Sequence, residues 1–203
     1  TLFPDFGVVA ESMKEETRRL VADVVWTRDA DFREMFDANY TYLDRTLAEY
    51  YGMRAYGIGL GGAFRRVEFP PTVPRGGLLA HGSFLARNAH AAVSSPTYRG
   101  KFIRERLMCQ AIPAPPANVN TTLPLDGSGT GATSAREKLE RHRTDPKCAS
   151  CHKLMDDIGL GLEKYDAGGK YRTDDNGATI DSRSTIEGLG TFDGPRELGG
   201  LLK

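Results

Sequence analysis

Two stretches near the start of the chain carry apolar residues at the three- and four-residue spacing of a helix that buries one face. The first runs from Glu11 to Trp26 and the second from Asp31 to Tyr51, with a short break at Thr27-Arg28-Asp29 between them. We expect two helices that pack as neighbours. The residues expected to face the core are Met13, Thr17, Leu20, Val21, Val24, Val25, Phe32, Met35, Phe36, Leu43 and Leu47.

Residues 52–77 lose this periodicity, because glycines and then prolines interrupt them. The pattern predicts irregular backbone with one short strand from Arg65 to Phe69. A glycine-rich loop can cradle phosphate at the start of a helix, but this one has neither the strand–loop–helix setting nor a following Lys-Ser/Thr pair. We therefore interpret it as a structural connection.

Helical spacing resumes from Gly77 to Ala92 and from Ser95 to Gln110, where Ser95-Pro96 is typical of a helix start. The segment from Ala111 to Gly131 is rich in proline and then in glycine, which favours an extended and then a flexible linker. We place the main domain boundary at this linker.

Beyond the linker, Ser134-Ala135-Arg136-Glu137 has the pattern of a capping box that begins a helix. A second helix is expected to carry residues 148–157 and to end at Gly159. Residues 170–180 predict a β-hairpin with its turn at Asp175-Asn176-Gly177. The last helix is expected to begin after Asp193-Gly194-Pro195.

The composition excludes several classes of protein. Basic and acidic residues number 27 each, so the chain has no net charge with which to attract nucleic acid. Hydrophobic residues make up 39% of the chain, a globular balance, and no apolar run approaches the roughly 18 residues that span a bilayer. The chain begins at Thr1 without an initiator methionine or a signal peptide and ends at Lys203 in an unfinished amphipathic pattern, so we expect a portion of a longer polypeptide.

The sequence Cys148-Ala149-Ser150-Cys151-His152 is the C-x-x-C-H attachment pattern for c-type haem. One helical turn places both thiols on one side, where they can add to the two vinyl groups of a porphyrin as thioethers. His152 follows directly and is expected to bind the iron from the proximal side. The motif therefore predicts one covalent haem c and an electron-carrying domain.

Other chemistry for these cysteines fits the sequence less well. A zinc site needs a fourth ligand and usually a second ligand pair, which the sequence does not offer. A thioredoxin-like dithiol needs a preceding strand, whereas a helix is expected before Cys148. Cys109 is left over, either as a buried thiol or bonded to a part of the protein absent from this chain. Acidic residues such as Glu137, Glu140 and Glu163 are expected on helix surfaces or as caps, and no nucleophile–base pair indicates hydrolysis.

The sixth iron ligand decides what the haem can do. We favour His90, because it comes from the opposite half of the chain, as a distal ligand must. The alternatives are His81, Met108, His142 and an open position. Met155 is excluded because it lies three residues after His152 on the same helix and so on the proximal side. Two strong ligands make an electron carrier, whereas an open position admits peroxide or a small gas.

The segment from Leu139 to Asp156, with the C-x-x-C-H motif inside it, resembles the C-terminal haem-binding module of the planctomycete-type cytochrome c proteins, which are large secreted proteins of uncharacterised function. The likeness continues to Gly169, and the segments 75–79, 94–102 and 113–119 resemble the module that precedes it. The resemblance implies export across the inner membrane, a periplasmic or extracellular location and redox protein partners of unknown identity. The chain departs from the family at Asp157, where proline is usual, so the contacts that support His152 are expected to differ; the position of His90 is often not histidine in the family.

We therefore predict a mainly α fold, in which a helical N-terminal part precedes a small cytochrome-c-like haem module with one short β-hairpin. The predicted modules are residues 1–70, residues 71–131 with the linker at their end, and residues 132–203 with the haem. The predicted function is electron transfer by a c-type cytochrome domain. The alternatives are a peroxidase-like oxidoreductase with an open sixth position, and a structural subunit of a larger surface or membrane complex that uses haem as a relay.

Overall fold

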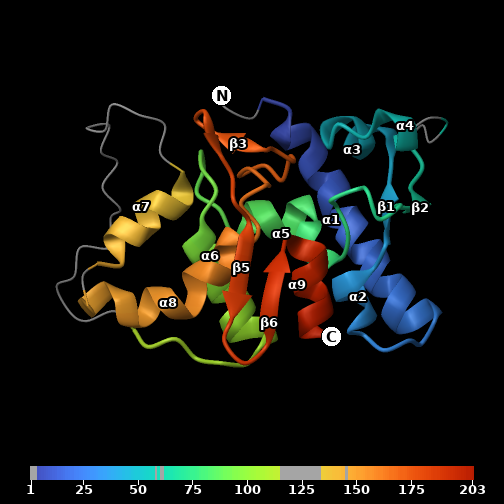
Figure 1. The fold of residues 1–203 in the computed structure, drawn as a ribbon. Helices are drawn as coiled ribbons and strands as arrows, with labels where there is room; N and C mark the ends of the chain where they lie inside the picture. The colour runs from blue at the N-terminus through green and yellow to red at the C-terminus, as the bar shows by residue number, and fades with distance from the viewer. Residues whose placement is uncertain (1–3, 58, 60–61, 115–133, 145) are drawn as a thin grey trace.

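Helices make up most of the secondary structure in the computed structural model, which describes residues 4–57, 59, 62–114, 134–144 and 146–203 (Figure 1). The α-helices are α1 (Phe6–Ala22), α2 (Glu34–Asp37), α3 (Arg45–Tyr50), α4 (Arg54–Gly57), α5 (Gly82–Arg87), α6 (Pro96–Phe102), α7 (Ala135–His142), α8 (Pro146–Leu160) and α9 (Pro195–Leu202). Shorter helical turns are η1 (Asp23–Thr27), η2 (Leu78–Ala80) and η3 (Ile103–Leu107). The predicted mainly α fold is confirmed.

The strands form two-stranded antiparallel sheets. The pairs are β1 (Tyr40–Leu43) with β2 (Arg65–Glu68), β3 (Asp174–Asp175) with β4 (Ala178–Thr179), and β5 (Arg183–Ile186) with β6 (Gly190–Asp193). The β1–β2 pair lies with α1 to α4 on one side of the molecule, α7 and α8 lie on the other side, and β5, β6 and α9 lie between them, with α9 against α2 (Figure 1). In the described part of the chain, no helix is both long and apolar enough to cross a membrane.

The first predicted helix is confirmed and extends further than expected. It begins at Phe6 and passes directly into η1, which ends at Thr27. Met13, Leu20 and Val24 are buried, as the three- and four-residue spacing predicts.

The second predicted helix, Asp31 to Tyr51, is wrong, because the chain forms α2, β1 and α3 there. Tyr40 to Leu43 is a run of residues that favour strands, and it pairs with β2, which lies far along the sequence. The carboxylate of Asp44 then accepts a hydrogen bond of 2.8 Å from the backbone N–H of Leu47 and so begins a new helix. Phe32, expected in the core, is 58% exposed in the turn before α2.

The predicted helix from Gly77 to Ala92 is also interrupted, because only η2 and α5 form there, whereas the predicted helix from Ser95 to Gln110 is confirmed as α6, which passes directly into η3. Gly77 has φ +69°, and a Cβ atom there would lie 1.9 Å from the carbonyl oxygen of Phe36, so this residue turns the backbone outside a helix. Ser95 behaves as expected: its hydroxyl caps α6 by accepting a hydrogen bond of 3.2 Å from the N–H of Tyr98.

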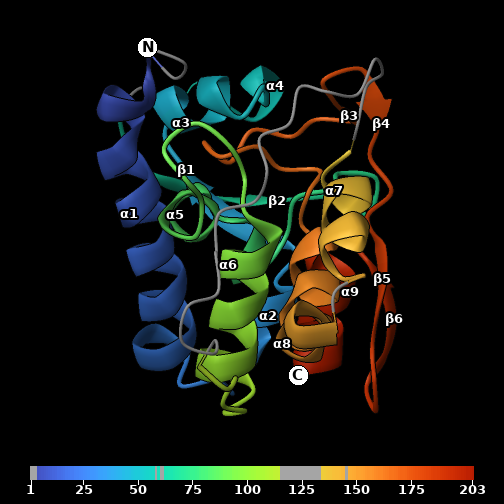
Figure 2. The same cartoon turned by 90° about the vertical axis from the view of Figure 1, so that its left-hand side faces the viewer.

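Helices α6 and α8 cross at contact distance, as Figure 2 shows from the side. A Cβ atom on Gly100 would lie 1.8 Å from the carbonyl oxygen of Met155, and one on Gly159 would lie 1.8 Å from that of Pro96. Only glycine permits this approach of two backbones. The crossing fixes α8 against a helix that precedes the linker in sequence.

One hydrophobic cluster is shared by the chain before and after the linker. Its buried members are Leu79, Phe84, Leu85, Ile103, Ile158, Leu162, Tyr165, Ile186, Phe192 and Leu198. Two further clusters surround α1 and the β1–β2 pair. The division into three modules stays a prediction, and most of the predicted linker, residues 115–131, lies outside the described residues.

The local signals near the C-terminus are confirmed. The Ser134 N–H donates to the carboxylate of Glu137 over 2.8 Å, and the N–H of Glu137 donates to the Ser134 hydroxyl over 3.2 Å, which is the expected capping box. The hairpin turns through Asn176 and Gly177, both with positive φ, as a tight two-residue turn requires. The β5–β6 hairpin was not expected from the sequence.

Candidate functional site

The predicted attachment residues lie together on α8. Cys148, Cys151 and His152 occupy its first two turns, and all three side chains are partly exposed. The two thiols are free of disulfides. The element that precedes α8 is α7, a helix, as the sequence predicts.

The ring of His152 is held by a carboxylate one helical turn further along α8. Its Nδ1 lies 2.9 Å from Oδ2 of Asp156, and Oδ1 of Asp156 accepts a hydrogen bond of 2.9 Å from the hydroxyl of Thr97 on α6. Asp156 is fully buried, whereas the His152 side chain is 18% exposed. A carboxylate that holds one ring nitrogen fixes the orientation of the ring and directs the other, Nε2, toward a metal.

Asp157, at which the sequence departs from the family it resembles, contacts the end of α7. Its carboxylate pairs with the guanidinium of Arg143 over 2.9 Å, which joins the end of α7 to α8. The residue that supports His152 is therefore Asp156. The spacing of four residues between His152 and Asp156 was a signal that could have identified it from the sequence.

The chain that leaves η3 returns to α8. The thiol of Cys151 lies 3.8 Å from the carbonyl oxygen of Pro113, which belongs to the described start of the predicted linker. Met155, one helical turn after Cys151 on α8, is buried. Pro113 thus lies close to the second of the two predicted attachment cysteines.

His90 lies in the loop between α5 and α6, which the bridge between Ala89 and Ser94 closes. Its side chain is exposed, and its ring centroid lies 4.7 Å from that of Tyr98. Tyr98 follows Thr97, the residue that holds Asp156. The structure thus places His90 at the end of α6 nearest the support of His152, but its ring contact is with Tyr98 and not with His152.

His81 is a buried structural residue. It is 1% exposed; its Nδ1 is 2.9 Å from the hydroxyl of Thr17 and its Nε2 is 3.2 Å from that of Thr41. The carboxylate of Glu16 lies 3.8 Å from Nε2. Because both ring nitrogens already have partners between α1 and β1, these contacts oppose His81 as an iron ligand.

Burial is the main cause that lowers the pKa of His81, and Arg75 lowers it further against the opposing effect of Glu16. The unfolded chain therefore takes up a proton near the usual pKa of 6.5 that the folded chain takes up only at lower pH. We expect the free energy of unfolding to fall as the pH drops below about 6.5. Chemical denaturation of the protein at a series of pH values between about 8 and 5 measures this fall.

In that series, His81→Asn should flatten the fall, because the titrating group is gone. The exposed Val93 provides a control without a titratable group, and Val93→Ala should keep the fall seen in the unaltered protein. Equal slopes for both variants would contradict the assignment to His81.

Two alternatives for the sixth iron ligand remain, Met108 and His142. Met108 is partly buried and packs against the shared hydrophobic cluster. Cys109, which follows it, is exposed and has φ +54°. His142 ends α7, and its side chain lies outside the described residues.

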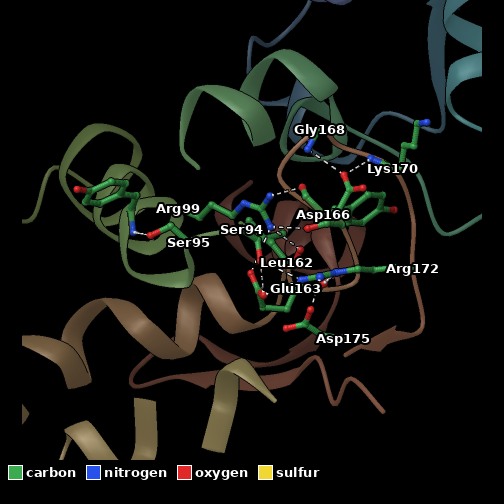
Figure 3. Close-up of polar contacts among 12 residues, drawn as sticks. Ser94, Ser95, Arg99, Leu162, Glu163, Asp166, Gly168, Lys170, Arg172 and Asp175 are labelled. Atoms are coloured by element: carbon green, nitrogen blue, oxygen red, sulfur yellow. Dashed lines mark hydrogen bonds and ion pairs between the residues drawn. The ribbon is translucent and has the colours of Figure 1, made fainter. Parts of the chain in front are cut away.

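Beyond the end of α8, the buried side chain of Arg99 donates hydrogen bonds to several backbone carbonyl groups (Figure 3). The guanidinium of Arg99 donates to the carbonyl oxygens of Leu162, Tyr165 and Asp166 over 3.0, 2.8 and 2.7 Å, and it lies 3.3 Å from a carboxylate oxygen of Glu163. Arg99 is fully buried, and burial lowers its pKa to about 10. Arg99, on α6, therefore fixes the turn that follows α8.

Glu163, expected on a surface or as a cap, is buried instead. Its carboxylate accepts hydrogen bonds of 2.7 Å from Ser94 and 3.1 Å from Arg172, and Arg172 also pairs with Asp175 over 2.7 Å. Burial raises the pKa of Glu163 despite these partners. The burial of Glu163 could not be predicted from the sequence, because its partners come from distant segments.

The described residues contain no group of three or more His, Cys, Asp and Glu side chains that could hold a metal ion by themselves. Cys148, Cys151 and His152 accordingly do not converge on one point as the ligands of a zinc ion would. Thiols and an imidazole that are to bind different atoms of one porphyrin need no such convergence.

Two family models match parts of the chain. Residues 75–175, which include α8, match PSCyt3, described as a protein of unknown function (DUF1588), and residues 1–53 match PSD4, described as a protein of unknown function (DUF1592). Both are domain families associated with planctomycete cytochrome c proteins. No curated protein and no solved structure matches the chain.

Proposed function

We propose that this chain is a c-type cytochrome domain that carries electrons through one haem, bound covalently to Cys148 and Cys151, with His152 as the proximal iron ligand. The observation that carries the proposal is the arrangement on α8. Both thiols and the imidazole lie within two turns of one helix, and Asp156 already holds Nδ1 of the imidazole. The donor set fits a haem because the nitrogen directed toward the iron is then Nε2.

The bound haem would supply a one-electron couple at its iron. The protein's own residues would keep the ring of His152 in one orientation while the charge of the iron changes. The crossing at Gly100 and Gly159 fixes α8 against α6, and the hydrogen bonds of Asp156 fix the ring of His152. Because the attachment residues are partly exposed, they would hold the group near the protein surface, where a redox protein partner could exchange electrons with it.

We propose that this function lies outside the cytoplasm, in the periplasm or at the cell exterior. The proposed thioether attachment and the resemblance to exported proteins support this location. The matches to cytochrome-associated domain families support the same proposal without testing it. The domain would relay electrons as part of a larger membrane-associated or surface complex.

A second candidate function follows from the carboxylate on His152. A strong proximal donor raises the electron density at iron, which favours reactions with peroxide when the sixth position is open. The chain would then be a peroxidase-like oxidoreductase.

An absorption spectrum of the purified holoprotein, recorded before and after denaturation, tests the proposal. We expect one haem per chain that remains bound after denaturation, and a low-spin spectrum in both oxidation states that carbon monoxide does not change. Haem that is extracted by denaturation, or zinc in place of iron, would contradict the proposal. A spectrum that changes with carbon monoxide would favour the oxidoreductase.

We propose His90 as the distal ligand of the carrier. His90→Ala is therefore expected to convert the low-spin spectrum to one that responds to carbon monoxide, because the sixth position opens. Val93, exposed in the same loop, provides the control, and Val93→Ala should keep the original spectrum. An unchanged spectrum in His90→Ala would remove His90 from the iron.

A further inference from the structure

We propose that Asp156 is a positioning residue that sets the reduction potential of the haem iron through its hydrogen bond to His152. This inference rests on the proposed function and adds a role for a residue outside the attachment motif. It is carried by the three-residue chain of contacts from Thr97 on α6 through Asp156 to His152 on α8.

The burial of Asp156 makes its hydrogen bonds strong. Its side chain has no exposed area, so the carboxylate has exchanged water for the Thr97 hydroxyl and the His152 ring, each at 2.9 Å. A hydrogen bond to a charged acceptor is roughly twice as strong as one between neutral groups, and a surrounding of low dielectric constant strengthens it further. The carboxylate of Asp156 therefore holds the ring of His152 in one orientation.

The two helices also prevent the carboxylate from turning away. Thr97 lies one residue after Pro96, whose carbonyl oxygen would be 1.8 Å from a Cβ on Gly159, and Asp156 lies one residue after Met155, which meets Gly100 in the same way. Donor and acceptor are thus fixed at the closest point of the crossing. The ring orientation is built into the packing of α6 on α8.

The consequence for the iron follows from electrostatics. An Nδ1–H group that donates to a carboxylate gives the imidazole partial anionic character, which makes Nε2 a stronger electron donor. A stronger donor stabilises ferric iron more than ferrous iron, because the ferric ion carries the larger positive charge. Asp156 is therefore expected to lower the reduction potential.

The test compares Asp156→Asn with Asp157→Asn in the holoprotein. Both remove one negative charge from neighbouring positions of α8, but Asp157 pairs with Arg143 and not with His152. In Asp156→Asn we expect a positive shift that changes the ratio of oxidised to reduced haem at a fixed potential by about tenfold, or about 59 mV for a one-electron couple. In Asp157→Asn we expect a distinctly smaller shift. Equal shifts, or none, would overturn the inference.

A measurement on the unaltered protein covers the case in which Asp156→Asn does not fold. With ¹⁵N-labelled histidine in the reduced holoprotein, the Nδ1–H proton of His152 should lie far downfield and exchange slowly with solvent. Rapid exchange at the ordinary position of an imidazole N–H would overturn the inference. Either result against it leaves a haem-bearing chain, whereas a chain without covalent haem overturns the proposed function itself.

Discussion

Replacing Cys148 and Cys151 together by serine is expected to produce a chain that retains no haem after denaturation, whereas the unaltered chain retains one. A serine hydroxyl does not form the thioether bond that a thiol forms with a vinyl group. Both side chains are partly exposed, so the substitution should change the stability of the fold little. Haem staining after denaturing electrophoresis and the mass of the intact chain measure the result.

The third cysteine gives this experiment a matched control. Cys109 is exposed and lies after η3, away from the attachment motif in the sequence. Cys109→Ser should keep the full haem content. Haem retained by the double variant, or lost equally in Cys109→Ser, would show that the cysteines of α8 are not the attachment points.

Features that depend on a few neighbouring residues could be predicted from the sequence. The capping box at Ser134 and Glu137 and the turn at Asn176-Gly177 are examples, because the partners of each hydrogen bond or dihedral preference lie within one turn. The placement of Cys148, Cys151 and His152 on one helix belongs to the same class.

Features that depend on distant partners could not be predicted in this way. The residues of β1 also satisfy helical spacing, and the alternative becomes favourable only because β2 supplies strand partners from residues 65–68. The glycine crossing of α6 and α8 similarly needs two segments on opposite sides of the linker.

The hydrogen bonds that hold His152 could also be predicted only in part. Asp156 could have been identified by its spacing from His152, but the hydroxyl of Thr97 that holds it comes from another helix. Arginine and glutamate usually lie on the surface, and only the fold buries Arg99 and Glu163 together. A single sequence does not indicate which of its polar residues are buried by contacts with distant segments.

Arg99→Met is expected to lower the free energy of unfolding by about 3 kcal/mol. Methionine fills similar space but donates no hydrogen bond to the carbonyl oxygens of Leu162, Tyr165 and Asp166. It also removes one of the two cationic partners of the buried Glu163 carboxylate. Chemical denaturation measures the loss, and Arg106→Met, at an exposed position of η3, should lose far less.

A double variant separates the two causes of this loss. Adding Glu163→Gln to Arg99→Met neutralises the buried carboxylate but restores no donor to the carbonyl groups. If the poorly compensated charge dominates, the double variant should recover part of the stability, although it carries one substitution more. If the carbonyl groups dominate, the double variant should be no more stable than Arg99→Met. A loss in Arg99→Met equal to that in Arg106→Met would contradict both causes, since it would mean that the turn after α8 keeps its place without the guanidinium.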